Sequence, residues 1–273
     1  MKELGVIQDK PFDAAVCRGA TLADLATDKI AWFLNEARRE RNLGLAESVV
    51  HEDALTHLKL LDDGKLTNAA VLLFGRDPQK FVPSAMVKCA RFHGTEVAKP
   101  ILARQNFEGT LFDHVDGAVD FVMLQLDRSI GTPAEGPGAP VTYEIPRKAV
   151  AETIVNAVAH RDYTSNASVQ VMMFSDRIEV WNAGHLPRGW TFDRLSEKHG
   201  SEPPNPSIVR PLYLAHYTES LGTGTLNVIR FCREANLPTP TFEQHGSQFV
   251  VTLWRDRLCT ACETARSIAS NRS

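Results

Sequence analysis

The stretch from Pro146 to Tyr163 constrains this sequence most, because it combines a clear helical pattern with polar residues that do not favour a helix. Proline is well tolerated in the first turn, where its missing N–H would have no partner in the helix. At about 100° per residue, one broad arc is apolar; it comprises Val150, Ala151, Ile154, Val155, Ala157 and Val158. Glu152, Asn156 and His160 form a stripe on the other side. The pattern predicts a helix that is packed along one face.

The polar stripe has two interpretations. Asn156 is a mediocre helix former, because its short amide competes for local backbone hydrogen bonds. The stripe could be an ordinary exposed face, on which Glu and His are common. Alternatively, Glu152 and Asn156 project together into a pocket, where the carboxylate handles a water molecule and the amide a metal-bound phosphate. The helix alone leaves both interpretations open.

Length and charge restrict the class of protein. A chain of 273 residues that is 43% hydrophobic can bury a substantial core, in one large domain or two modest ones. The net charge is −3, with acidic and basic residues interspersed. The densest basic run, Arg38-Arg39-Glu40-Arg41, is interrupted by a glutamate. The sequence therefore predicts no nonspecific DNA binding by this chain alone.

Cysteine usage and the absence of long apolar runs indicate the compartment. The five cysteines are odd in number and scattered, which argues against a disulfide framework and for a reducing environment. Cys259 and Cys262 form a C-x-x-C without a second pair, which is poor evidence for zinc. No signal-peptide core occurs near the N-terminus, and no apolar run approaches the roughly 20 residues of a membrane span. We expect a cytoplasmic protein without a membrane partner.

The first 107 residues predict a helical and β module. The expected elements are a helix from Leu22 to Asn42 capped by Thr21, a helix from Glu52 to Leu61, a turn at Asp63-Gly64, and strands from Leu66 to Phe74 and from Met86 to Phe92. This order is compatible with a winged-helix module. Simple core packing is the favoured interpretation, because the second helix offers mainly His57 and Lys59 as outward polar groups, a poor surface for a DNA groove.

The remainder predicts a second domain over residues 108–255, followed by a disordered tail over 256–273. Helices are expected at 110–128, 206–217 and 226–235, with a short one near 192–197, strands at 141–145, 168–174, 177–181, 241–243 and 248–254, and Gly/Pro-rich or polar loops at 131–140 and 185–206. The fold class is α+β: the N-terminal module precedes a two-layer α/β sandwich with helices on one face of a mixed sheet.

Two further motifs follow the polar helix. The strand from Arg177 ends in Asn182-Ala183-Gly184, where a polar side chain and a glycine can meet a ligand. Gly222-Thr223-Gly224-Thr225 then opens the last predicted helix. N–H groups at the positive end of a helix can hold phosphate oxygens. A turn that requires glycine is the simpler explanation of the second motif taken alone.

In combination, these motifs resemble a known type of domain. Glu-x-x-x-Asn on a helix, Asn-x-Gly ending a strand and Gly-Thr-Gly opening a helix are similar to the ATP-binding (Bergerat) domain of gyrase, heat-shock chaperones, histidine kinases and MutL (GHKL). E-T-I-V-N-A-V-A-H-R-D-Y, R-I-E-V-W-N-A-G-H-L-P, N-P-S-I-V-R-P-L, E-S-L-G-T-G-T and L-T-N-A-A-V-L-L-F-G more closely resemble the bacterial RecG-related, ATP-dependent DNA helicase-like proteins. The likeness extends from about Thr21 to Trp254.

The resemblance implies roles for individual residues. Glu152 would be the catalytic base for the water that attacks the γ-phosphate of ATP, and Asn156 would be the ligand of a phosphate-bridging Mg²⁺. Asn182 would face the adenine edge, with Gly184 at the pocket floor. The phosphates would be lined by Gly222, Thr223, Gly224 and Thr225, and residues 185–220 would form a lid. The resemblance assigns no role to His160, Arg161 and Asp162, for which a buried helix end is an equal interpretation.

The sequence departs from the family pattern in ways that affect function. The usual adenine-reading Asp is Asn182, and the second glycine of the usual box is replaced by Leu186. Asn can still accept a hydrogen bond from the adenine amino group. No G-x-x-x-x-G-K-[ST] loop is present, so helicase activity is not supported. His160-Arg161-Asp162 echoes a kinase catalytic loop, but the companion kinase motifs are lacking.

Two functions follow from this pattern. The first is an ATP-binding protein, with slow Mg²⁺-dependent hydrolysis through Glu152 and a link to DNA or transcriptional regulation. The alternative is a non-hydrolysing regulatory or interaction module with a vestigial pocket. Members of the family commonly begin with an AlbA-like, Schlafen-type domain, so a DNA partner would act indirectly or through a domain outside this chain. A homodimer is compatible with either function.

Overall fold

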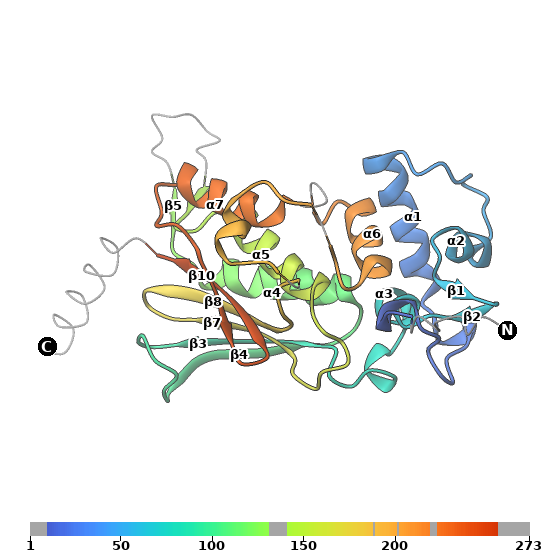
Figure 1. The fold of residues 1–273 in the computed structure, drawn as a ribbon, viewed down its shortest axis with the longest axis horizontal. Helices are drawn as coiled ribbons and strands as arrows, with labels where there is room; N and C mark the ends of the chain where they lie inside the picture. Colours follow the sequence, from blue (N-terminus) through green and yellow to red (C-terminus); the bar gives the residue numbers. More distant parts are fainter. Residues whose placement is uncertain (1–9, 131–140, 188, 201, 219–222, 256–273) are drawn as a thin grey trace, which may run out of the picture.

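The computed structural model describes residues 10–130, 141–187, 189–200, 202–218 and 223–255 (Figure 1). A six-stranded mixed sheet forms its centre, in the order β4-β3-β7-β8-β10-β9. β3 and β7 pair in parallel, and every other neighbouring pair is antiparallel. The strands are β3 (Val87–Phe92), β4 (Ile101–Phe107), β7 (Val169–Met173), β8 (Arg177–Ala183), β9 (Thr241–His245) and β10 (Gln248–Trp254).

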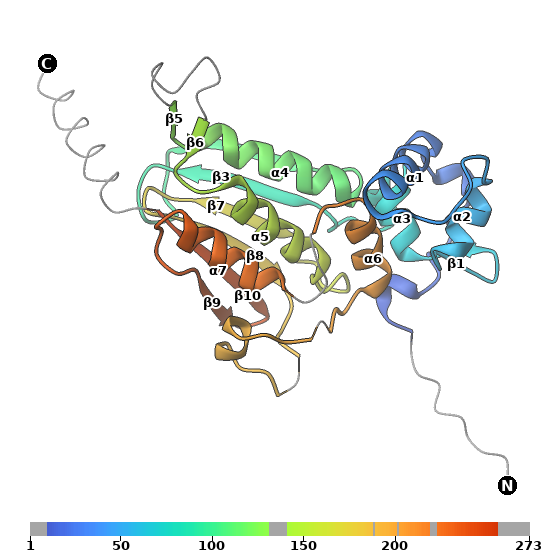
Figure 2. The same ribbon diagram turned by 90° about the horizontal axis from the view of Figure 1, so that it is seen from above.

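Three helices cover one face of this sheet. α4 (Leu111–Gln125), α5 (Arg147–Ala159) and α7 (Gly224–Glu234) lie side by side, with α5 in the middle (Figure 2). Apolar residues of α5 such as Val150, Ile154 and Val158 are buried in the core beneath it. Two short strands, β5 (Arg128–Ile130) and β6 (Val141–Tyr143), pair between α4 and α5 in the sequence. The predicted α+β class, with helices on one face of a mixed sheet, is confirmed.

The N-terminal part packs against one end of these layers (Figure 1). It contains α1 (Thr27–Arg41), α2 (His51–His57), the paired β1 (Leu61–Asp62) and β2 (Lys65–Leu66), and α3 (Asn68–Phe74), with short 3₁₀ turns at Phe12–Ala14, Leu22–Asp24 and Pro78–Lys80. Phe112 at the start of α4 packs against Phe33 of α1 and Phe74 of α3, with ring centroids 6.2 and 6.1 Å apart. One buried core therefore runs from the N-terminal helices into the sheet.

The prediction of a strand from Leu66 to Phe74 was wrong. This segment is α3, and the side chain of Thr67 caps it by accepting a hydrogen bond from the N–H of Ala70 at 3.2 Å. The six apolar residues of α3, from Ala69 to Phe74, are all buried. A short apolar run that is buried all round carries no periodicity, so its sequence does not distinguish a helix from a strand.

The edge strand β4 was not predicted, and it changes the layout of the chain. β4 pairs only with β3, and β3 is hydrogen-bonded to β7, so the sheet begins on the N-terminal side of the boundary predicted after residue 107. The predicted strand at 86–92 is thus a central-sheet strand, and the predicted strand at 66–74 is helical. The two strands on which the winged-helix comparison relied do not form a wing.

The other predicted elements agree with the structure within a few residues, with one change at α1. Thr21 precedes the 3₁₀ turn at Leu22–Asp24, and α1 begins only at Thr27. The loop at 131–140 and the tail at 256–273, including Cys259 and Cys262, lie outside the described residues. None of the described helices is long and apolar enough to cross a membrane.

Candidate functional site

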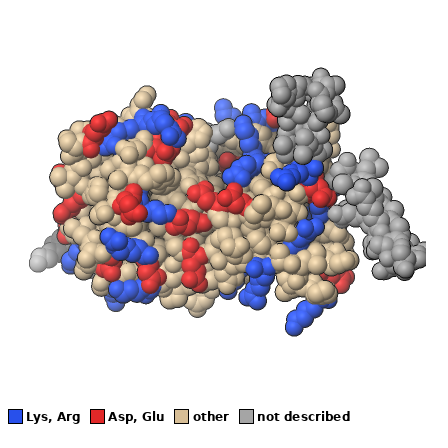
Figure 3. Space-filling view, turned by 180° about the vertical axis from the view of Figure 1, so that it is seen from behind, with Lys and Arg blue, Asp and Glu red and all other residues tan. Residues whose placement is uncertain are grey.

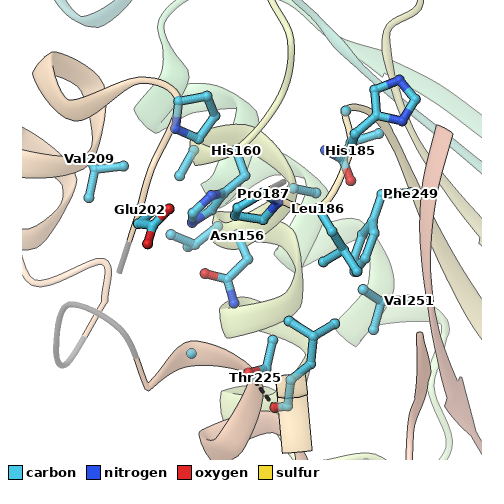
Figure 4. Close-up of a pocket in the computed structure, with 18 of the residues that line it drawn as sticks. Asn156, His160, His185, Leu186, Pro187, Glu202, Val209, Thr225, Phe249 and Val251 are labelled. Atoms are coloured by element: carbon cyan, nitrogen blue, oxygen red, sulfur yellow. Dashed lines mark hydrogen bonds between the residues drawn. The ribbon is translucent and has the colours of Figure 1, made fainter. Parts of the chain in front are cut away.

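A cavity of about 270 Å³ lies where the helix layer, the sheet and the polar loop meet. Its walls come from the C-terminal half of α5, the end of β8, β10, the segment from His185 to Pro204, the helix α6 (Pro206–Leu214) and the first turn of α7. Figure 4 shows side chains from these elements pointing toward a common space. Small-molecule sites typically begin near this size, at about 300 Å³.

The polar stripe of α5 faces this cavity rather than open solvent. Asn156 lines it and is half-buried, and His160, at the end of the helix, presents its surface to it. No hydrogen bond of either side chain is recorded among the described residues. Glu152 lies deeper, with 5% of its surface exposed, and its Oε1 accepts a hydrogen bond from Oγ1 of Thr218 at 3.4 Å. The solvent exposure of the stripe therefore increases along α5, from the buried Glu152 to the exposed His160.

Gly224 brings the start of α7 against this wall. A Cβ atom at Gly224 would lie 2.6 Å from Nδ2 and 2.9 Å from Oδ1 of Asn156, and 2.7 Å from Oε1 of Glu152. Real Cβ contacts essentially never fall below 3.0 Å, so only glycine allows the backbone to approach so closely. The structure therefore brings together Glu152, Asn156 and Gly224, which lie far apart in the sequence.

Two other residues of the motif from Gly222 to Thr225 are described in the structure, Thr223 and Thr225. Thr223 is the residue before α7, and Thr225 lines the cavity from its first turn. No acidic residue occupies this turn, so the partial positive charge of the helix end is not offset there. Gly222, also predicted to line phosphates, lies outside the described residues.

The end of β8 supplies a second polar group to the cavity. Asn182 is buried, with 4% of its surface exposed, and its Nδ2 donates to the carbonyl of Ala183 at 3.3 Å. No partner of its Oδ1 is recorded among the described residues, which leaves this acceptor for a ligand. Gly184 also lines the cavity, and a Cβ there would lie 3.2 Å from the carbonyl oxygen of His160. The apolar side chains of Phe249 and Val251 on β10 complete this end of the cavity (Figure 4).

Described residues of the segment predicted as a lid line the cavity, and two of them contact α7. The hydroxyl of Thr225 donates to the carbonyl of Leu195 at 2.8 Å, and Nε2 of His199 lies 3.2 Å from the same hydroxyl oxygen. The ring of His199 also packs edge-on against Trp190, with centroids 4.7 Å apart. Sequence reasoning did not identify His199 or Trp190. The only signal was a polar loop, and their partners lie elsewhere in the chain.

The second half of the predicted lid is a packed helix. Asn205, directly before α6, donates from Nδ2 to the carbonyls of Ala159 at 3.0 Å and Arg161 at 2.7 Å, which caps the end of α5. Arg41 of α1 donates to the carbonyl of Thr218 at 3.1 Å. Residues 205–218 are therefore held against both α5 and the N-terminal part.

The three residues without a predicted role have different positions. His160 lines the cavity and keeps part of its surface exposed; the protein atoms around its ring partly desolvate it and lower its pKa, with a smaller contribution from His199. Arg161 is buried at 1% exposure and donates to Oγ of Ser84 at 2.8 Å. Asp162 accepts from the N–H of Thr164 at 2.9 Å. Arg161 and Asp162 therefore shape the turn after α5, and only His160 can meet a ligand.

The fold is a two-layer α+β sandwich with a cavity between a helix, a strand end and a loop. A crystal structure of the protein DIP2311 from Corynebacterium diphtheriae shares this fold, with a TM-score of 0.71 at 21% sequence identity. The alignment covers 92% of this chain and 49% of that protein, so the chain spans about half the length of its structural relative.

The family comparison is more specific over the C-terminal part. Residues 166–253 match the family described as "Putative ATP-dependent DNA helicase recG C-terminal". This match confirms the resemblance to RecG-related proteins over the segment that contains β7, β8, the lid, α7 and the last hairpin. α5, which carries Glu152 and Asn156, precedes the matched segment. A search of curated proteins gave no match.

Proposed function

We propose that the cavity binds ATP together with Mg²⁺. The observation that carries this proposal is the convergence of Glu152, Asn156 and the first turn of α7 at Gly224. A helix N-terminus without a first-turn acid attracts phosphate, and a neighbouring amide and carboxylate suit a metal-bound phosphate and its attacking water. The match to an ATP-dependent family over residues 166–253 supports the same ligand.

The two ends of the cavity differ in chemistry, and this difference orients the nucleotide. Asn182 presents an acceptor beside the apolar Phe249 and Val251, which suits a base with an exocyclic amino group. Asn156 and Thr225 also line the cavity, beside the positive end of α7. Adenine would therefore lie against β8 and β10, and the phosphates against α7.

Magnesium fits this site as an ion carried by the nucleotide. No cluster of three or more His, Cys, Asp or Glu side chains that could hold a metal exists among the described residues. Mg²⁺ commonly takes only one or two protein ligands and completes its shell with phosphates and water. Oδ1 of Asn156 is the group that would hold it, and the ion would supply neutralising charge to the phosphates.

Hydrolysis would depend on Glu152. Its carboxylate would accept the proton of the attacking water, and its hydrogen bond with Thr218 would keep it oriented. Gly224 packs directly against Glu152, so the start of α7 has to shift before a water and a γ-phosphate reach the carboxylate. Slow turnover follows from this obstruction.

A link to DNA would require a partner or another domain. On the face shown in Figure 3, Lys and Arg side chains are interspersed with Asp and Glu rather than gathered in one basic patch. Nucleic-acid binding needs such a patch to neutralise phosphates. We therefore propose that any role in DNA or transcription is exerted through contacts outside this surface; a homodimer stays a prediction.

Calorimetric titration with Mg-ATP tests the proposal. We expect the wild type to bind, Asn156→Ala to bind at least tenfold more weakly, and Glu152→Gln to bind ATP but lose hydrolysis. Asn106→Ala on β4 and Glu47→Gln after α1 are matched controls at exposed positions away from the cavity. Binding without any hydrolysis in the wild type would favour the non-hydrolysing regulatory module. Neither heat nor a thermal shift at millimolar ATP would refute the proposal.

A further inference from the structure

The last turn of α1 holds the segment that leads from α6 toward the cavity. α1 and α6 lie side by side (Figure 1). Nε of Arg41 donates to the carbonyl of Tyr213 at 3.3 Å, and its Nη2 donates to the carbonyl of Thr218 at 3.1 Å. The guanidinium also lies over the ring of Tyr213, 4.3 Å from its centroid. Arginine suits this place, because its planar fork can donate to two acceptors and stack on an aromatic ring.

Further contacts hold the same turn. Nδ1 of His216 lies 3.2 Å from Oε2 of Glu40 on α1, and the hydroxyl of Tyr217 donates to Oδ2 of Asp116 on α4 at 2.7 Å. The backbone of His216 has a φ of 63°, a left-handed conformation that residues other than glycine seldom adopt. Residues 213–218 therefore form a fixed turn, anchored on both α1 and α4.

Thr218 connects this turn to the site. Its side chain lines the cavity, and its hydroxyl donates to Oε1 of Glu152 at 3.4 Å. The carbonyl that Arg41 holds and the hydroxyl that Glu152 accepts belong to the same residue, so a shift of one displaces the other. A catalytic base has to lie within hydrogen-bond reach of the proton it removes, and a misplacement of about 1 Å can cost about 100-fold in rate.

We propose that Arg41 is a positioning residue for Glu152. This inference rests on the proposed hydrolysis of ATP. Arg41 is not among the described residues that line the cavity, and it acts by fixing Thr218, whose hydroxyl orients the carboxylate. The N-terminal part of the chain is thereby a component of the hydrolytic site. Its contact with residues 213–218 sets the rate of turnover rather than the affinity for the nucleotide.

The competing role for Arg41 is purely structural: it ties α1 to α6. Arg38 provides a matched comparison, because it also lies near the end of α1 and also donates to two backbone carbonyls, those of Leu45 at 2.9 Å and Ala46 at 2.7 Å. None of these three residues lines the cavity. Removing Arg38 therefore reproduces the loss of two backbone contacts from α1 while leaving Thr218 in place.

The test measures kcat for phosphate release from Mg-ATP by the full chain, and Kd for Mg-ATP by calorimetry. We compare the wild type with Arg41→Ala, Thr218→Val, the double variant and the control Arg38→Ala. For Arg41→Ala we expect kcat to fall by about 10- to 100-fold while Kd changes by less than about threefold. The double variant should turn over about as fast as Thr218→Val, because changes along one chain of contacts are not additive.

Urea unfolding checks that each variant is folded. If Arg41→Ala does not fold, Arg41→Gln takes its place: it keeps one amide donor but not the fork, and kcat should still fall by at least about threefold. Arg38→Ala should lower stability without lowering kcat by more than about twofold.

The outcomes separate the two roles. A loss of kcat alone in Arg41→Ala that is absent from Arg38→Ala and not additive with Thr218→Val would support the inference. Turnover within twofold of the wild type, an equal loss in Arg38→Ala, a parallel loss of affinity, or full additivity would overturn it and leave ATP hydrolysis standing. A wild type that binds ATP without hydrolysing it would remove this inference alone with the hydrolytic step, and a wild type that does not bind ATP would remove the proposed function as well.

Discussion

The closest approach in the site, between Gly224 and the side chains of α5, predicts a sharp effect of one methyl group. In Gly224→Ala, the new Cβ would lie 2.6 Å from Nδ2 of Asn156 and 2.7 Å from Oε1 of Glu152. Both atoms are at the ends of side chains, so the two side chains rather than the backbone must move. A displacement off a favoured rotamer costs about 0.5–1.5 kcal/mol, which gives about 1–3 kcal/mol for the pair.

Stability should fall by less than this sum, because alanine is a better helix former than glycine by up to about 1 kcal/mol. A net cost of 0–2 kcal/mol corresponds to a decrease in Tm of about 2–4 °C per kcal/mol for a chain of this size. Affinity is the sharper measure. Moving Asn156 away from the proposed Mg²⁺ position would remove one polar contact with a charged group; taken at the value of a hydrogen bond to a charged group, this costs about 1.5–3 kcal/mol, or about 10- to 150-fold in Kd.

The assay combines thermal unfolding with Mg-ATP titration of the purified variant. Gly44→Ala is the matched control, because a Cβ at Gly44 meets nothing within 4 Å and should change neither Tm nor affinity. A Gly224→Ala protein with an unchanged Tm that binds Mg-ATP within twofold of the wild type would refute the reasoning. Such a result would mean that the start of α7 does not rest on Asn156 and Glu152 in solution.

Three further substitutions test the fold. Arg255→Ala removes the cation paired with the largely enclosed Glu144 carboxylate and should cost up to about 3–5 kcal/mol in urea unfolding, whereas Arg147→Ala at an exposed pair should cost less than about 1 kcal/mol. Thr67→Ala removes the cap of α3 and should cost about 0.5–2 kcal/mol; no loss would argue against the helix. Burial lowers the pKa of His114 to about 4. The unfolded state therefore binds the extra proton between about pH 6.5 and 4, stability falls as pH decreases through this window, and His114→Gln should flatten that slope.

The sequence predicted those parts of the site in which a residue type is unusual for the secondary structure around it. The α5 stripe was recognisable because Asn156 is an unfavourable residue in a helix, and Gly224 because glycine precedes a helical pattern. The resemblance implied that Asn156 and Gly224 lie close together, and the close contact at Gly224 agrees with this. The exposed interpretation of the stripe does not hold for Glu152, which is buried.

Other features had no local signal. After Asn68, α3 is apolar throughout, so neither helical nor strand periodicity is visible in it. β4 is largely exposed at the sheet edge, so its residues do not alternate between apolar and polar. His199 contacts Thr225, which follows it by 26 residues, and no local pattern indicates this contact. Such contacts depend on tertiary structure, which one sequence does not encode in any short pattern.

Thr218 connects two distant parts of the molecule, and this has a consequence for how ligand binding can be observed. Its hydroxyl reaches Glu152 in the site, while its carbonyl is held by Arg41 at the last turn of α1. A ligand that moved Glu152 would therefore act, through Thr218, on a helix that contributes no side chain to the cavity among the described residues. The rate of amide-proton exchange at the end of α1 should therefore change when a ligand binds. This remote helix can then report ligand binding without any added label.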